Sequence, residues 1–332
     1  MTRPRSYRAG IRHAHAALRA SAKTAAVVPA QAWRWKWRWD ARRLPLTAAH
    51  RAQYATIHRV SFRKFLRFPN LRAPTTFNDR IQWLKLFDQS PAIIEASDKL
   101  RVKDRVRAVL GDGYVPETLA VGASVRDVDL AQLPDRFVLK TTHDSGSVWL
   151  VPDKRSFDAA AATRFFDAAV AARYGGDKGE WAYAHVTPRV FAEAWVDAGS
   201  DGPPADYKFH CVEGRVAFVQ FIDGRDATPR ESLADRDGRP LPDHLNPENG
   251  RGPAFRRPGA WSDLVDVAES LADPFKYVRV DLYLSRNQPV VGELTFYPKA
   301  GFFRGSGQRH LGRFLTFDVT TFRPPVSGGG SS

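Results

Sequence analysis

The chain lacks several features that would assign it to a protein class at once. Its 332 residues include one cysteine, Cys211, which excludes an internal disulfide and favours a reducing compartment. No stretch approaches the roughly 20 apolar residues of a membrane-spanning helix. A phosphate-loop pattern (GxxxxGK[ST]), a zinc-finger or RNA-binding signature and an internal repeat are also absent. We therefore expect a cytoplasmic protein, either soluble or peripheral at the inner face of the membrane.

Positive charge is concentrated near the start of the chain. Residues 1–43 hold eleven Lys and Arg against one acid, Asp40, and so supply +10 of the net +14, leaving +4 for the rest. Because the body is only weakly basic, no nucleic-acid partner is expected. The length and the 43% hydrophobic content suffice for about two domains.

The basic leader, residues 1–45, is not a secretory signal, since Arg19, Lys23 and Pro29 interrupt its apolar residues. Its segment WRWKWRW (33–39) alternates tryptophan with cations, a composition that suits the headgroup layer of an anionic membrane. The alternatives are a disordered basic tail and an upstream start outside the working protein.

Periodicity and capping residues predict mixed helices and strands after the leader. Thr76 is a candidate N-cap for a helix that buries Ile81, Leu84 and Phe87. Further helices are expected within 47–74, from Asp98 to Gly111 or Gly113, from a Ser156 cap to near Tyr174, and over 262–272. Strands are expected over 137–140, 148–151 and 189–196, a hairpin over 207–223 turning at Glu213–Gly214, and loops over 224–260.

The stretch YVRVDLYLSRNQPVVGELTFYPKAG (277–301) alternates as a second hairpin, turning at Asn287. This register sets Asp281 opposite Glu293 on the polar face, where paired like charges destabilise a sheet. A Mg²⁺ ion between the two acids would cancel the repulsion, and Arg279 beside them could hold a phosphate. Alternatively, the acids face solvent or pair with Arg279. The predicted buried face is Val278, Val280, Leu282, Leu284, Val290, Gly292, Leu294 and Phe296.

Two further motifs contain residues suited to nucleotide binding, each with an ordinary structural alternative. In KTTHDSGSV (140–148), Lys140 precedes the small residues Ser145 to Ser147, whose backbone amides could approach an anion; a plain hairpin is the alternative. The neighbouring His143 and Asp144 are not read as a catalytic pair. In SDKLRVK, Lys99 falls in the first turn of a predicted helix, an unfavourable place for a cation unless it reaches an anion; an exposed lysine is the alternative.

The motif FAEAWV places Glu193 and Trp195 on one face of a strand end. A carboxylate and an aromatic there could frame a base and a ribose, or could form a simple sheet edge.

Taken in order, these motifs resemble the ATP-grasp superfamily, especially D-alanine:D-alanine ligase-like enzymes. The TupA-like ATP-grasp family, named for teichuronopeptide biosynthesis, is a closer match from about Phe77 to Phe317, through FNDRIQWLKL, FVLKTTHDSGSV, DYKFHC, FKYVRVDLY and GELTFYPKAG. The resemblance implies an α+β ATP-grasp fold, in which two α+β subdomains clasp ATP between antiparallel sheets, with a helical N-terminal extension. The implied parts are a helical module (46–97), a lid subdomain (98–192), a C-terminal subdomain with the metal hairpin (193–322) and a flexible tail (323–332).

The resemblance also implies roles for individual residues. Lys99 and Lys140 would contact ATP phosphates under the loop Ser145, Gly146 and Ser147. The backbone of Glu193, Ala194, Trp195 and Val196 would meet adenine, with Asp206 at the ribose and Lys208 also at the nucleotide. Asp281 and Glu293 would bind one or two Mg²⁺ ions, while Arg279 and Lys140 would act on the transferring phosphoryl group. Thr295 stands where the superfamily usually has asparagine, and its hydroxyl is a weaker metal ligand, which bears on the second ion.

The implied activity is a ligase that phosphorylates a carboxylate with ATP and passes the acyl group to an amine, giving an amide, ADP and phosphate. The expected partners are an amino acid and a cell-surface glycan, and residues 1–43 could meet an anionic membrane. Candidate substrate contacts are His143, Lys208, Arg225, Arg230 and Lys299. The alternatives are a glycosyltransferase using DVD (127–129) or DRD (235–237), an ATP-grasp kinase, and a non-catalytic scaffold.

Overall fold

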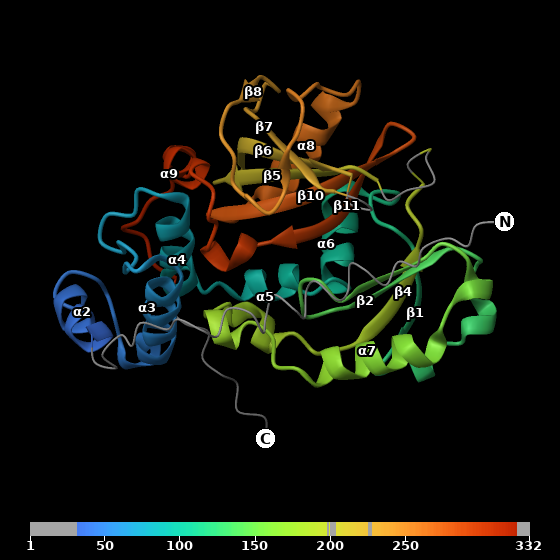
Figure 1. Cartoon of the computed structure of the whole chain (residues 1–332), viewed down its shortest axis with the longest axis horizontal. Coiled ribbons are helices and arrows are strands. Elements are labelled where there is room, and N and C mark those ends of the chain that lie inside the picture. Colours follow the sequence, from blue (N-terminus) through green and yellow to red (C-terminus); the bar gives the residue numbers. More distant parts are fainter. Residues whose placement is uncertain (1–31, 198, 200–203, 225–227, 324–332) are drawn as a thin grey trace.

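Two sheets and their covering helices form the molecule (Figure 1). The computed structural model describes residues 32–197, 199, 204–224 and 228–323. A seven-stranded sheet lies above a four-stranded sheet in this view, and helices α2 and α3 stand at one end. All strand pairs are antiparallel except that of β7 with β9. The expected α+β class, with two largely antiparallel sheets and N-terminal helices, is confirmed.

The small sheet has strand order β1-β4-β2-β3 and packs against helix α7. Its apolar core lies between these layers and includes Phe137, Leu139 and Phe166. The cap predicted at Ser156 is wrong, because the Asp158 side chain accepts a hydrogen bond from Ala161 N at 2.9 Å. The elements are β1 (Thr118–Gly122), β2 (Phe137–Thr141), β3 (Val148–Val151), α7 (Ala159–Ala171) and β4 (Val190–Ala194).

The large sheet follows the order β11-β10-β5-β6-β7-β8, with β9 beside β7, and helix α8 packs on its β10, β5 and β6 strands. The turn predicted at Glu213–Gly214 is confirmed; both residues have positive φ, 46° and 79°. The sequence predicts loops over residues 224–260, yet three short strands from this region extend the sheet. The elements are β5 (Asp206–Val212), β6 (Arg215–Asp223), β7 (Arg230–Ala234), β8 (Pro240–Leu241), β9 (Gly250–Arg251), α8 (Trp261–Ala272), β10 (Tyr277–Ser285) and β11 (Gln288–Thr295).

The β10–β11 hairpin turns at Arg286 and Asn287 and sets Asp281 opposite Glu293, as predicted. A bulge at Gly292 then shifts the register, so that Leu282 pairs with Val291 instead of Gly292. The alternation predicted for β11 before the bulge is therefore wrong, because Val291 packs in the core cluster in place of Val290 and Gly292. In contrast, Leu282 and Leu284 of β10 pack there as predicted. Glycine is required at position 292 because a Cβ would lie 2.6 Å from the Tyr283 ring.

The N-terminal helices pack into the same core as the large sheet. Thr76 caps α4 as predicted, accepting from Asp79 N at 3.1 Å. The helix expected from Asp98 begins later, at Arg101, so Lys99 lies in the preceding turn and not in the first helical turn. The elements are α2 (Ala32–Asp40), α3 (Arg51–Phe65), α4 (Phe77–Phe87), α5 (Pro91–Ser97) and α6 (Arg101–Leu110).

Part of the predicted leader is folded. Residues 1–31, like 324–332 of the predicted tail, lie outside the described residues. Residues 32–40 form α2, whose Asp40 is fully buried and accepts a hydrogen bond from the Tyr54 hydroxyl at 2.9 Å. Among the described helices, none combines the length and the apolar character needed to cross a membrane.

Candidate functional site

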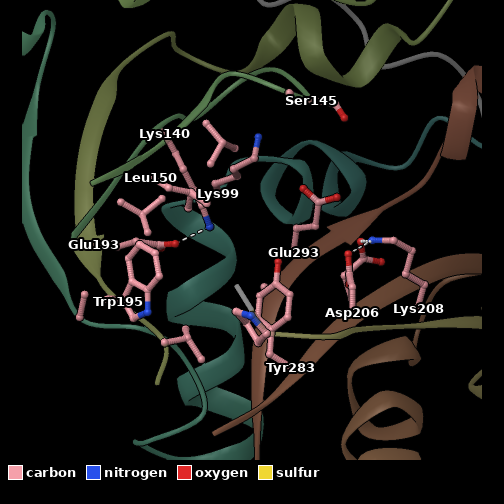
Figure 2. A pocket seen from close by; sticks show the side chains of 18 of the residues that line it. Lys99, Lys140, Ser145, Leu150, Glu193, Trp195, Asp206, Lys208, Tyr283 and Glu293 are labelled. Carbon is pink, nitrogen blue, oxygen red and sulfur yellow. Dashed lines mark hydrogen bonds and ion pairs between the residues drawn. The ribbon is translucent and has the colours of Figure 1, made fainter. Parts of the chain in front are cut away.

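A cleft of about 370 Å³ lies between the two sheets, and side chains from both enter it (Figure 2). The wall on the side of the small sheet includes Lys140, Leu150, Glu193 and Trp195. The wall on the side of the large sheet includes Asp206, Lys208, Tyr283 and Glu293. The predicted site residues that line this cleft are Lys99, Lys140, Ser145, Gly146, Glu193, Ala194, Trp195, Val196, Asp206, Lys208, Arg279, Asp281 and Glu293.

Lys140 and Glu193 make a buried ion pair on the small-sheet wall, where β2 and β4 are hydrogen-bonded neighbours. A second lysine, Lys103 of α6, reaches the same carboxylate with its Nζ 2.9 Å from Oε2. Burial favours the protonated form of Glu193, yet the two ammonium charges outweigh it and hold the carboxyl pKa below its usual range. Thus Glu193 contributes a charged side chain to the site, whereas the family resemblance implied a contact through its backbone.

Sequence reasoning missed Lys103. Its only signal is its place in the DKLRVK motif, one helical turn after Lys99. The ammonium also donates to Pro116 O at 2.9 Å and to the Thr118 hydroxyl at 3.0 Å. This set of contacts ties α6 to the small sheet and fixes Glu193 facing Lys140.

The loop after β2 is organised by Asp144. Its carboxylate accepts hydrogen bonds from the Thr141 and Ser147 hydroxyls, while its backbone carbonyl accepts one from Lys99 Nζ. The Ser147 side chain is thereby committed to the loop and does not line the cleft, unlike Ser145 and Gly146.

An apolar region lies beside these charges. Val138 and Leu150 line the cleft next to Trp195, whose ring has the Arg136 guanidinium carbon 4.6 Å from its centroid. The sequence reading did not single out Val138 and Leu150. Strand parity could have found Val138, because it lies two residues before Lys140 and shares its face. The combination of an apolar wall and adjacent cations suits a planar base joined to phosphates.

The opposite wall holds the paired acids. Arg279 binds Asp281 in a bidentate fashion, with Nε to Oδ1 and Nη2 to Oδ2 both at 2.6 Å, and its Nη2 lies 3.2 Å from Glu293 Oε1. The Thr295 hydroxyl donates to the same Glu293 oxygen at 2.9 Å but does not line the cleft. The alternative in which Arg279 pairs with the acids is therefore present in the structure, and it offsets the cross-strand repulsion.

Lys208 joins the acids to the neighbouring strand. Its Nζ lies 2.6 Å from both Asp206 Oδ2 and Asp281 Oδ2. Burial raises the pKa of Glu293, but the charges of Lys99, Arg279 and Lys208 prevail and lower it to about 2. Both hairpin acids thus lie among cations, and Glu293, with 28% of its side chain exposed, is accessible from the cleft.

The carboxylates of the cleft supply only part of the ligands that Mg²⁺ needs. No group of three or more His, Cys, Asp or Glu able to hold a metal occurs among the described residues. Mg²⁺, however, is commonly bound through one or two carboxylates together with substrate phosphates and water. Asp281 and Glu293 supply that number of carboxylates on one face, so they fit an ion that arrives with ATP.

The remaining predicted residues lie elsewhere. His143 is buried, its ring nitrogens have no hydrogen-bond partner among the described residues, and it does not line the cleft. Lys299 lines a second hollow that shares Lys208 with the cleft. Arg230 lines neither, and Arg225 lies outside the described residues. The acids of DVD (127–129) and DRD (235–237) do not line the cleft either.

Comparison with known proteins identifies one family. The sequence profile of the TupA-like ATP-grasp family matches residues 79–316. No curated protein matches the chain.

Several solved structures are similar to the chain. D-alanine–D-alanine ligase from Bacillus anthracis complexed with ATP has 14% identity over 61% of this chain and 55% of its own, with a TM-score of 0.37. The ATP-grasp ligase PsnB complexed with minimal precursor has 14% identity over 68% and 62%, with a TM-score of 0.38. The ADP complex of N5-carboxyaminoimidazole ribonucleotide synthetase has 13% identity over 66% and 50%, also with a TM-score of 0.38. The chain thus spans less than two thirds of the length of each.

Proposed function

Because the chain belongs to the TupA-like ATP-grasp family, we propose that it is an ATP- and Mg²⁺-dependent ligase that joins a carboxylate to an amine. One observation carries this proposal. Lysines on the small-sheet side and paired acids on the large-sheet side line a single cleft that also has an apolar wall. Such a cleft offers separate surroundings for a base, a polyphosphate and a divalent cation.

In this proposal each wall binds a different part of ATP. Val138, Leu150 and Trp195 hold the adenine, and the strand end from Glu193 to Val196 offers backbone groups to its edge. Lys99 and Lys140 bind the phosphates beneath the loop from Ser145 to Ser147. Asp206 and Lys208 lie between the ribose and the phosphates.

The metal would be held by Asp281 and Glu293, with Thr295 supporting the Glu293 carboxylate. When bound, the ion neutralises phosphate charge and orients the γ-phosphoryl group. Arg279 then exchanges part of its contact with Asp281 for the oxygens of the transferring group, since a guanidinium binds phosphate and carboxylate alike. Positioning and charge neutralisation supply the catalysis, and no protein nucleophile is needed.

The reaction balances in two steps. A carboxylate oxygen of the substrate attacks the γ-phosphorus of ATP. The bond between that phosphorus and the oxygen bridging to the β-phosphate breaks, ADP departs, and an acyl phosphate is formed. The amine nitrogen then attacks the acyl carbon, phosphate departs, and the nitrogen loses a proton to give the amide.

We further propose that one partner is an amino acid and the other a cell-surface polysaccharide or its precursor. The support is the family's association with teichuronopeptide biosynthesis. Reaction at such a precursor would take place at the inner face of the membrane.

Helix α2 supports a peripheral membrane location. Trp33 and Trp37 pack against the core, whereas Trp35 and Trp39 are 66% and 46% exposed and stack on one another with centroids 6.0 Å apart. The guanidinium carbon of Arg72 lies 5.6 Å from the Trp39 ring centroid. Exposed tryptophans among arginines suit the headgroup layer of an anionic membrane.

Thermal unfolding of the full chain tests the nucleotide site. With Mg²⁺ and a non-hydrolysable ATP analogue we expect a higher melting temperature, because ligand binds the folded state alone. Glu293→Gln should abolish the Mg²⁺-dependent part of the shift, while the control Glu95→Gln, on the surface, should retain it. A shift with UDP-sugars in place of the ATP analogue would contradict the ligase and favour a glycosyltransferase.

Trapping with hydroxylamine tests the chemistry. An acyl phosphate reacts with hydroxylamine to give a hydroxamate, whereas the phosphoester made by a kinase does not. Hydroxamate formation that requires ATP and a carboxylic acid is the expected result, and ADP release without hydroxamate would indicate a kinase.

A further inference from the structure

A second hollow, of about 270 Å³, adjoins the nucleotide cleft. Asp206, Lys208 and Arg279 line both, so these side chains form the partition between the two spaces. The carboxamide wall of the hollow consists of Gln220, the cross-strand neighbour of Lys208, and of Asn246 and Asn249 from the loop before β9. A molecule in this hollow would reach the same arginine that faces the ATP phosphates in the proposed function.

A buried carboxylate holds the carboxamide wall in place. Glu231 of β7 is 2% exposed, and its Oε2 accepts a hydrogen bond from Gln220 Nε2 at 2.7 Å. Its Oε1 accepts from Leu245 N at 2.6 Å, and its Oε2 also accepts from Asn246 N at 3.2 Å. These bonds tie β6 to the loop that supplies Asn246 and Asn249, which gives the hollow a preorganised polar wall.

The rim of the hollow is basic. Lys299 lines the hollow and pairs with Glu248 at 2.8 Å, beside Asn249. Lys64 and Arg304 also interact with Glu248, and Lys178 lies close enough to Lys64 to act on its charge. Asp177, 4.0 Å from Lys178, and Glu180 are the acids near that lysine. Lys299, Lys64 and Arg304 thus share one acid, Glu248, which leaves an excess of positive charge at the rim.

The backbone that presents Lys299 is strained and is held by buried donors. Lys299 and Ala300 have φ of 50° and 53°, in the left-handed region that side chains other than glycine rarely adopt. Two residues of α4 bind the carbonyl of Ala300: Gln82 Nε2 at 3.0 Å and Lys85 Nζ at 2.7 Å. At Gly301, a Cβ would lie 2.5 Å from Gln82 Nε2. Strain maintained by such contacts is typical of functional sites, and here it directs Lys299 to the rim.

We propose that this hollow binds the carboxylic acid that the ligase activates, and that the acid carries a second anionic group, which Lys299 and its neighbouring cations bind. The inference rests on the proposed function. The carboxylate to be phosphorylated lies at Arg279 and Lys208, next to the γ-phosphate. The carboxamide wall binds polar substituents between the two charges, and the second anion meets the rim.

Matched pairs of acids test this inference on the full chain with Mg²⁺ and the ATP analogue bound. The probes are glutarate beside glutaramate, and glucuronate 1-phosphate beside glucuronate; each pair differs by one anionic group. At least one probe with the additional anionic group should bind about tenfold more tightly than its partner in calorimetry. Lys299→Gln combined with Arg304→Gln should remove this preference and leave the affinity for the ATP analogue unchanged. The control Arg309→Gln, exposed and outside the rim, should leave both intact.

The outcomes separate this inference from the proposed function. Equal binding within every pair, a preference that survives the double variant, or no binding of any probe with the additional anionic group would each overturn the second site. If the ATP analogue still binds in a Glu293-dependent manner, the nucleotide site remains. Loss of nucleotide binding itself would instead refute the proposed function.

Discussion

At the scale of single residues, the site is a set of charges that neutralise one another. Asp281 and Glu293 face each other across a hairpin, and Arg279 and Lys208 lie among them. A carboxylate pair of this kind can exchange protein cations for a metal and phosphates without changing the backbone. The arrangement therefore suits a site that is alternately empty and loaded.

Glu193 gives a test of how far stability depends on this neutralisation. It is buried between Lys103 and Lys140, so Glu193→Gln leaves two buried ammonium groups without their counter-charge. We expect the free energy of unfolding to fall by about 3–5 kcal/mol, measured by denaturant titration. Glu95→Gln, which removes the partner of the exposed Arg101, should cost less than about 1 kcal/mol. Similar losses in both variants would contradict a structural role for the buried cluster.

At the scale of elements, helix α4 connects the N-terminal module to the rim of the second hollow. The ammonium of Lys85 donates to Lys178 O at 2.8 Å, Ala300 O at 2.7 Å and Gln82 Oε1 at 3.1 Å. These contacts join α4 to the segment before β4 and to the strained turn after β11. The helix thus positions a site to which it contributes no lining residue.

Lys85 predicts a dependence of stability on pH. Burial lowers the pKa of its ammonium; the charge of Glu180 opposes this effect, Lys178 adds to it, and Asp177 opposes it weakly. As the pH rises through this lowered pKa towards the ordinary value of about 10.4, the folded state loses the proton before the unfolded chain does. Over that range the unfolded chain binds more protons, so stability increases with pH, by at most about 1.4 kcal/mol per unit.

The measurement compares the free energy of unfolding of the wild type and Lys85→Met between pH 8 and 10. The wild type should gain stability relative to the variant as the pH rises. Lys154→Met is the control, because Lys154 also donates to two backbone carbonyls but lies near the surface. Parallel curves for the wild type and Lys85→Met would show that Lys85 does not titrate in this range.

At the scale of the whole molecule, charge is distributed unevenly. Residues 1–43 carry +10 of the net +14, and α2 directs two of their tryptophans outward. We expect the full chain to sediment with vesicles of phosphatidylglycerol but not with those of phosphatidylcholine, and less well at high salt. Replacing Trp35 and Trp39 with alanine should weaken binding by about tenfold, equivalent to ~1.4 kcal/mol.

The control for this prediction is Val121→Ala, an exposed apolar residue on the small sheet. It should leave vesicle binding unchanged. Binding to both lipids alike, or an equal effect of both changes, would contradict recognition of anionic headgroups by α2.

The sequence by itself determined much of the local structure and the types of chemical group in the cleft. Alternation located the hairpin of Asp281 and Glu293, and Thr76 marked the start of α4, because these signals depend on neighbouring residues. The family resemblance brought together Lys99 and Lys140, which are 41 positions apart and which no local pattern could join.

Only the tertiary structure decided how the charged side chains of the cleft are paired and which other residues position them. Periodicity does not encode contacts between distant segments, such as the ion pair of Lys103 with Glu193 and the hydrogen bond from Lys85 to Ala300. It does not encode the register shift at Gly292 either. The tertiary structure also decided that residues 32–40 fold onto α3. The sequence pattern alone predicts that all four tryptophans lie at the surface, whereas the helix buries one pair and exposes the other. Long-range packing and burial set these features, and both depend on the complete fold.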